Sequence, residues 1–308
     1  MLVTSVPYPV AFHIEVTNMC TLECSGCART RFIEQWPKYW KNFNLDHEDL
    51  NNFLDIDIKS MEFILCGNYG DPIYHPNLHK IINVLKTRGG NIKIVTNGSY
   101  KKSKWWLSIL KLLDKNDTIV FSIDGIPENF TEYRKNGDWK SIELAIKECV
   151  KSEVKIIWKY IVFSFNEANI DEARELSKSF GVDEFEIHHS DRFDEKTMHL
   201  MPTEKIHIGA RHSKQVKFKN QLENDINPRC KNNKDEHFIT ATGHYVPCCY
   251  IADHRFYYKT QFGKNRKEYS IKDIKFSELM QSENTQEFYS NIESTKPMPC
   301  QFNCPKIN

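Results

Sequence analysis

The sequence predicts an α/β fold: a parallel sheet that forms an open, partial (β/α)6 barrel, followed by a small C-terminal domain of mixed helix and strand. Runs rich in β-branched and aromatic residues alternate with amphipathic stretches six times from residue 12 to about residue 190. Six units are fewer than the eight that close a barrel of about 250 residues. Beyond residue 191 the alternation stops, and cysteines recur instead. We therefore predict one domain at residues 1–190 and a second at residues 191–308.

The six strands are predicted from short apolar runs that end in polar or small residues. They cover residues 12–16, 61–65, 92–95, 118–123, 154–163 and 184–188. Strand and helix in alternation imply parallel pairing with right-handed crossovers. Ligands of such sheets bind at the C-terminal ends of the strands, so we expect the functional residues in the loops that follow them.

Helices are predicted where apolar residues recur at spacings of three and four. One begins after Asn77, and another has its apolar stripe at residues 142–150. A third is predicted to start at Asn169, with Glu172 completing a capping box. In the C-terminal part, residues 237–246 are expected to form a hairpin that turns at Gly243, and residues 276–292 a single helix.

Charge and hydropathy exclude several classes of partner. Forty-two Lys and Arg against forty-one Asp and Glu give a net charge of +1, which offers no broad surface for nucleic acid or an anionic membrane. No run of about 18 apolar residues is present, so no membrane span is expected. The first ten residues, which include Pro7 and Pro9, do not resemble a signal peptide. We expect a cytoplasmic protein.

The chain contains ten cysteines. Disulfides are rare in a reducing compartment, so clustered cysteines point to metal. Cys20, Cys24 and Cys27 follow the first predicted strand. Three thiolates so closely spaced can hold three corners of a [4Fe-4S] cluster and leave the fourth iron open. A structural zinc ion is the alternative, although it needs a fourth ligand.

The Cys-x3-Cys-x2-Cys loop, placed after the first strand of a six-unit β/α chain, resembles that of the radical S-adenosylmethionine (SAM) superfamily. Residues 67–72, Gly-Asn-Tyr-Gly-Asp-Pro, are similar to the Gly-Gly-Glu-Pro motif of that family, which holds the SAM amino group. Residues 96–98, residues 122–125 and Arg134 match further loops in order. The resemblance implies a SAM-binding [4Fe-4S] cluster on the three cysteines. It also implies that SAM is bound by Gly70, Asp71, Thr96, Asn97, Ser122, Asp124 and Arg134.

Two positions depart from the family pattern. Asp71 stands where Glu is usual, which shortens the side chain by one methylene, so backbone groups near Gly70 are an alternative source of the amino-group contact. Gly26 stands where an aromatic residue usually packs against adenine. The aromatic contact to adenine is therefore expected from another part of the chain.

The C-terminal cysteines resemble the SPASM and Twitch extensions of the same superfamily. Twelve residues separate Cys230 from Gly243 and four separate Gly243 from Cys248, a spacing that opens those extensions, and Cys300 and Cys304 complete four ligands. The resemblance implies one auxiliary [4Fe-4S] cluster. Cys249 is an alternative ligand to Cys248, because neighbouring strand residues point to opposite faces. A structural zinc ion is again the alternative metal.

The function that the resemblance implies is reductive cleavage of SAM to a 5'-deoxyadenosyl radical, which abstracts hydrogen from a substrate. A fully ligated auxiliary cluster favours electron relay and hence substrate oxidation. The electron would come from an external low-potential donor such as flavodoxin or ferredoxin. Because only about ten residues precede the first strand, a small-molecule substrate is favoured over a peptide. A peptide-modifying maturase and a non-enzymatic binding module stabilised by zinc or iron–sulfur remain the alternatives.

Overall fold

The computed structural model describes residues 11–190, 192–208, 225–231 and 236–306. Within them one eight-stranded sheet has the order β6-β5-β4-β3-β2-β1-β7-β8. The strands are β1 (Ala11–Ile14), β2 (Glu62–Leu65), β3 (Asn91–Thr96), β4 (Thr118–Ser122), β5 (Lys155–Val162), β6 (Glu184–His189), β7 (His237–Ile239) and β8 (Tyr245–Val246). All neighbouring strands from β6 to β7 pair in parallel, and β8 runs antiparallel to β7. The six predicted barrel strands are confirmed, with ends that differ by a few residues.

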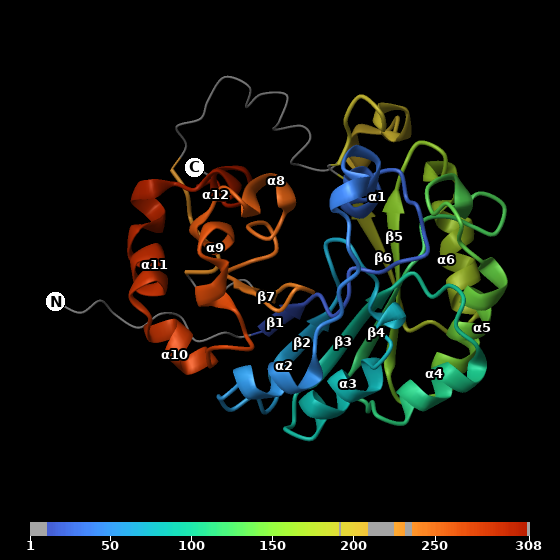
Figure 1. Ribbon diagram of the computed structural model, residues 1–308. Helices are drawn as coiled ribbons and strands as arrows, with labels where there is room; N and C mark the ends of the chain where they lie inside the picture. Colours follow the sequence, from blue (N-terminus) through green and yellow to red (C-terminus); the bar gives the residue numbers. More distant parts are fainter. Residues whose placement is uncertain (1–10, 191, 209–224, 232–235, 307–308) are drawn as a thin grey trace.

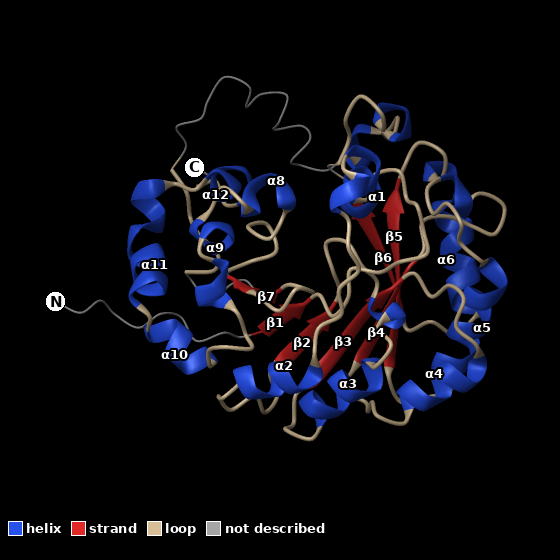
Figure 2. Cartoon of the chain, viewed as in Figure 1, coloured by secondary structure: helices blue, strands red, loops and turns tan. Residues whose placement is uncertain are grey.

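Helices cover the outer face of the six-strand barrel (Figures 1 and 2). They are α2 (His47–Phe53), α3 (Leu78–Lys86), α4 (Ser103–Leu110), α5 (Trp139–Cys149) and α6 (Ile170–Ser179). The predicted apolar stripe of α5 is buried from Ile142 to Cys149. Figure 1 shows α1 (Ala28–Gln35) at the end toward which the β5 arrow points, so the cysteine loop before α1 lies at the C-terminal ends of the strands.

The capping box predicted at Asn169 is wrong. The Asn169 side chain donates to Glu172 Oε2 at 3.0 Å and accepts no backbone N–H. A capping residue needs an extended backbone to turn its side chain toward the first helical turn, whereas Asn169 has φ −101° and ψ 9°.

The C-terminal part continues the same sheet. The predicted hairpin is confirmed, with Gly243 at φ +71°, where a side chain would be strained. The remaining helices, α8 (His254–Tyr257), α9 (Gln261–Lys264), α10 (Phe276–Gln281), α11 (Glu283–Thr295) and α12 (Met298–Asn303), gather beside β7 (Figure 1).

The single helix predicted for residues 276–292 is two helices, α10 and α11. The chain is extended at Ser282, whose ψ is 143°. The Ser282 hydroxyl bonds the Leu279 carbonyl oxygen at 2.7 Å and the Thr285 hydroxyl at 2.9 Å. Serine favours such local bonds at helix starts, and they replace the bonds that a continuous helix would have made.

The hydrophobic core is shared between the barrel and the C-terminal part. Phe276 of α10 packs edge-on against Phe12 of β1 and Phe53 of α2, with ring centroids 5.4 Å and 5.7 Å apart. Tyr245 of β8 is fully buried beside the rings of Phe53 and Phe276. The C-terminal part is therefore held by apolar packing against the barrel, in addition to whatever its cysteines bind. None of the helices in the described ranges combines the length and apolarity that crossing a bilayer requires.

Candidate cofactor and metal site

The three N-terminal cysteines lie together on the loop between β1 and α1. Cys24 is buried, and Cys20 and Cys27 are half-buried. The Cys27 N–H donates to the Cys24 carbonyl oxygen at 3.0 Å, and Cys27 begins α1 as its N-cap residue. The Cys20 sulfur accepts from the Leu22 N–H at 3.4 Å and from Asn97 Nδ2 at 3.7 Å. These bonds hold the loop against the end of β3.

Burial raises the pKa of both Cys20 and Cys24 to about 12, and the positive charge of Arg134 acts against this rise at Cys24. Thiols of such high pKa are poor nucleophiles, but metal coordination deprotonates a thiol outright. The N–H groups of Leu22 and Asn97 that point at the Cys20 sulfur, and the positive charge of Arg134 near Cys24, would then stabilise the thiolates. The loop thus fits an iron–sulfur cluster, whose properties depend on hydrogen bonds to sulfur.

A ready-made site for a single metal ion is not found in the residues that the structure describes. In the described part of the chain, no three His, Cys, Asp or Glu side chains converge closely enough to bind one metal ion. A tetrahedral zinc ion holds sulfur at about 2.3 Å and would draw its ligands tightly together.

The Gly70-Asp71 turn is fixed by the protein around it. A Cβ atom at Gly70 would lie 1.8 Å from the Thr17 carbonyl oxygen, so only glycine permits this approach of the two loops. Asp71 is buried, and burial raises its pKa. One of its oxygens accepts from the Thr96 hydroxyl at 2.8 Å, and the other accepts from the backbone and side-chain N–H groups of Asn97. The Asp71 carboxylate therefore positions the end of β3, and a direct contact to SAM from Asp71, Thr96 or Asn97 stays a prediction.

A buried ion pair lies at the end of β4. Arg134 contacts one oxygen of Asp124 through Nε and Nη2, both at 2.7 Å, and the other oxygen accepts the Ile161 N–H at 2.9 Å. Both Asp124 oxygens are thus committed, and Arg134 is held with its charge near Cys24. Ser122 is half-buried beside Lys159 of β5, and its hydroxyl makes no hydrogen bond within the described residues.

Tyr133 occupies the space that a side chain at position 26 would fill. A Cβ atom at Gly26 would lie 2.9 Å from the Tyr133 hydroxyl oxygen and 3.4 Å from its ring. The Tyr133 ring stacks on Phe163, with centroids 4.3 Å apart and an angle of 30°. Both rings pack in one apolar cluster with Cys24. Two buried aromatic rings thus lie beside the cysteine loop, and an aromatic contact to adenine stays a prediction.

The C-terminal cysteines also come together in space, although they are distant in sequence. Cys230, Cys248 and Cys300 are buried, and Cys304 is half-buried. Burial and the neighbouring thiols Cys230, Cys249 and Cys300 raise the pKa of Cys248. Burial also raises the pKa of Cys300, with Cys230 and Cys304 adding to the effect. Cys248 thus lies near Cys230 and Cys300, and the choice between Cys248 and Cys249 as a ligand stays a prediction.

Glu15, which no sequence motif singled out, lies at the centre of this region. Its Oε1 accepts the N–H groups of Tyr69 at 2.7 Å and Gly70 at 3.4 Å. Burial raises the pKa of Glu15 to about 7. In the sequence it is one more residue of the first predicted strand, so no signal distinguished it.

The loop of residues 67–72 also contacts the C-terminal part. Asn68 Nδ2 donates to the Cys249 carbonyl oxygen at 3.0 Å. The Tyr69 hydroxyl accepts the His254 N–H at 2.9 Å and lies 3.2 Å from His254 Nδ1. The two predicted metal sites are therefore joined through this loop.

Comparison with known proteins supports the sequence resemblance. Residues 14–179, more than half of the chain, match the family described as the Radical SAM superfamily. A protein of Pyrococcus furiosus named tungsten-containing aldehyde ferredoxin oxidoreductase cofactor-modifying protein is 26% identical over 117 residues. That match spans 37% of this chain and only 31% of the relative.

Two solved structures are similar in fold. SuiB of Streptococcus suis, bound to precursor peptide SuiA, has a TM-score of 0.60 at 15% identity, over 93% of this chain and 67% of SuiB. BtrN in complex with AdoMet and 2-DOIA has a TM-score of 0.51 at 12% identity, over 98% of this chain and 94% of BtrN. At these identities the likeness concerns the fold alone, and it confirms the parallel α/β barrel class.

Proposed function

This chain belongs to the radical SAM superfamily, and we propose that it is an enzyme that cleaves SAM reductively at a [4Fe-4S] cluster held by Cys20, Cys24 and Cys27. The observation that carries the proposal is the gathering of these thiols, with N–H donors on the Cys20 sulfur, beside the buried Asp124–Arg134 pair. When bound, the cluster and SAM would supply the radical that abstracts hydrogen from the substrate.

The surrounding residues bind and orient in this proposal. Arg134, fixed by Asp124, provides the positive charge for the carboxylate of SAM. The Tyr133 and Phe163 stack provides the aromatic contact for adenine that Gly26 does not. Asp71 fixes the end of β3, and backbone groups near Gly70 would bind the SAM amino group. Ser122, whose hydroxyl is uncommitted within the described residues, is the remaining contact.

An auxiliary [4Fe-4S] cluster is the second part of the proposal. Its ligands would be Cys230, Cys248, Cys300 and Cys304, whose thiols act on one another's pKa. A cluster with four protein ligands would have no open iron, so its role would be to accept the electron left on the oxidised substrate. An external low-potential donor of the flavodoxin or ferredoxin class would deliver the electron for SAM cleavage.

We propose a small molecule as the substrate. BtrN, whose structure contains AdoMet and 2-DOIA, aligns over nearly its whole length with this chain, which supports this choice. SuiB, which was crystallised with a precursor peptide, supports the second candidate, modification of a peptide. In that case the barrel chemistry would be the same and only the substrate would differ.

The test is formation of 5'-deoxyadenosine by the anaerobically reconstituted protein under reductant. We expect cleavage of SAM by the natural protein and none by Cys24→Ala, because the loss of one ligand removes a corner of the cluster. Cys149→Ala is the matched control, since this thiol is buried in the apolar stripe of α5. Cleavage that survives Cys24→Ala, or is missing from the natural protein with its iron loaded, would refute the assignment.

A further inference from the structure

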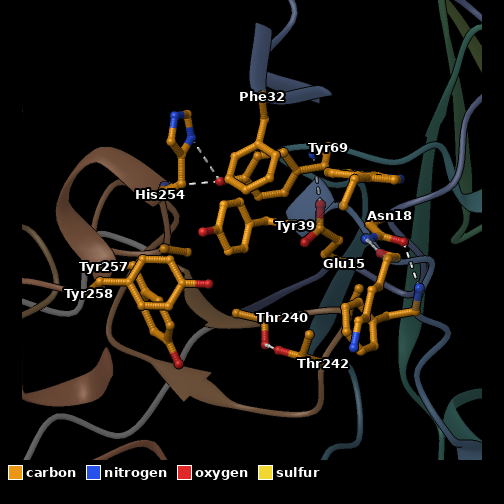
Figure 3. Close-up of a pocket in the computed structure, with 15 residues that line it drawn as sticks. Glu15, Asn18, Phe32, Tyr39, Tyr69, Thr240, Thr242, His254, Tyr257 and Tyr258 are labelled. Atoms are coloured by element: carbon orange, nitrogen blue, oxygen red, sulfur yellow. Dashed lines mark hydrogen bonds between the residues drawn. The ribbon is translucent and has the colours of Figure 1, made fainter. Parts of the chain in front are cut away.

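A cavity of about 130 Å³ lies where the barrel meets the C-terminal part, and Tyr69 of the loop of residues 67–72 is among its lining residues. Figure 3 shows aromatic rings from both parts facing this space, with Glu15 between them. We call it the seam pocket; its walls include Phe32, Tyr39, Trp40, Tyr257 and Tyr258. A dry cavity of about 150 Å³ takes a benzene molecule. The seam pocket is close to this size and open on one side, so it can take a ring or stem of about six non-hydrogen atoms with the rest of the ligand at its rim.

The charge in the seam pocket is concentrated on one carboxyl group. Glu15 is only 3% exposed, and no salt bridge reaches it within the described residues. The backbone N–H groups of Tyr69 and Gly70 donate to its Oε1, and backbone groups of Asn68 and Ala241 also favour its ionised form. Its second oxygen points toward the pocket in Figure 3. Lys41, also in the lining, is exposed at the rim. Burial lowers the pKa of the lining residue His254, which keeps its ring neutral.

These features select a cation. The faces of aromatic rings carry negative potential and attract ammonium groups, most strongly where water is excluded. An anion would be repelled by an ionised Glu15, whereas a cation would favour the ionised form of Glu15 and supply the opposite charge that this buried carboxyl lacks. We propose that the seam pocket binds a primary ammonium group on a short apolar stem, with Glu15 as its counter-ion.

The position of the seam pocket connects it to the SAM site. The Glu15 oxygen that binds the backbone contacts Tyr69 and Gly70, both in the loop of residues 67–72. Asn18, another lining residue, stands two positions before Cys20. An amine held here would anchor a substrate beside that loop. The anchoring of a substrate rests on the proposed function, whereas the binding of an amine in the seam pocket does not. The amine could belong to a small molecule or to a lysine side chain of a peptide.

The experiment is anaerobic calorimetry on the reconstituted protein with benzylamine and its neutral counterpart benzyl alcohol. We expect saturable binding of one benzylamine per chain, at least about tenfold tighter than that of benzyl alcohol, because a hydrogen bond to a charged group adds this much. Glu15→Gln should abolish the preference. Glu143→Gln, a carboxyl on the outer helix α5, should retain it. Equal affinity for the two probes, or no binding of benzylamine, would overturn the proposal.

A second variant tests the seam pocket independently, in case Glu15→Gln does not fold. Tyr258 is 60% exposed at the rim, so Tyr258→Leu should fold and should weaken benzylamine by about 2- to 5-fold. Unchanged benzylamine binding to this variant would also contradict the proposal. Nα-acetyl-lysinamide identifies the source of the amine: tighter binding than benzylamine assigns a peptide lysine, and weaker binding assigns a small amine.

Assaying SAM cleavage on the same preparations separates this inference from the proposed function. Cleavage without amine binding would overturn the seam pocket alone. Amine binding without cleavage would overturn the proposed function and leave the pocket in place.

Discussion

Substitutions at Tyr133 and Gly26 should change SAM affinity together, because the two residues share one space beside the cysteine loop. Tyr133→Leu keeps most of the buried volume and removes the aromatic face. Stacking of a base on an aromatic ring contributes about 1–3 kcal/mol. We therefore expect about 5- to 150-fold weaker SAM binding by Tyr133→Leu in anaerobic equilibrium dialysis. Tyr133→Phe, the matched control, keeps the ring and should bind SAM nearly as the natural protein does.

Gly26→Ala, alone and combined with Tyr133→Phe, tests whether the two residues act through the same space. Its Cβ atom would lie 2.9 Å from the Tyr133 hydroxyl oxygen, so Gly26→Ala must displace the ring and weaken SAM binding. Removal of that hydroxyl leaves the nearest ring carbon at 3.4 Å, an ordinary contact. The double variant Gly26→Ala with Tyr133→Phe should therefore recover affinity, a non-additive result typical of residues in contact. Natural affinity in Tyr133→Leu, or no recovery in the double variant, would refute this explanation.

Three further predictions concern charge and cluster content. Asp124→Asn leaves the Arg134 charge buried without its partner and should lower the free energy of unfolding by about 3–5 kcal/mol. Anaerobic urea denaturation measures this difference. An unchanged free energy would contradict the role of the buried ion pair in stability. The pKa of Glu15 is raised from 4.5 to about 7. Its contribution to the free energy of unfolding, on the order of 3 kcal/mol, is therefore complete below pH 4.5 and is lost as the pH rises toward 7. Glu15→Gln should remove this pH dependence from denaturation curves, and its persistence would show that another group titrates. Cys248→Ala should reduce the measured iron content from about eight to about four atoms per chain, and Cys249→Ala should leave it unchanged. The reverse result would show that Cys249, and not Cys248, is the ligand.

Much of the barrel is predictable from the sequence because its signals are local. The helix of residues 78–86 shows its buried face in the spacing of Leu78, Ile81, Ile82 and Leu85 alone. The pairing of β7 with β1 has no such signal, since it joins strands at opposite ends of the chain. The break at Ser282 was missed because apolar residues continue on both sides of it, and only the serine's local bonds interrupt the helix.

The same distinction holds for the candidate site. The spacing of Cys20, Cys24 and Cys27 is enough by itself to predict a metal-binding loop, because the ligands are neighbours in sequence. The glycine at position 26 predicted a missing aromatic contact, but only the fold places Tyr133 opposite it. Glu15 could not be found from sequence, because its burial depends on two loops and the C-terminal part closing around it.

The central claim is that the N-terminal cluster has one iron without a cysteine ligand, to which SAM binds. It is tested most directly by the electron paramagnetic resonance spectrum of the reduced protein, recorded with and without SAM in the Cys248→Ala variant, which should retain only that cluster. We predict a [4Fe-4S] signal that changes shape when SAM is added and vanishes with Cys24→Ala. A signal indifferent to SAM, or a colourless protein that carries zinc on these cysteines, would contradict the claim.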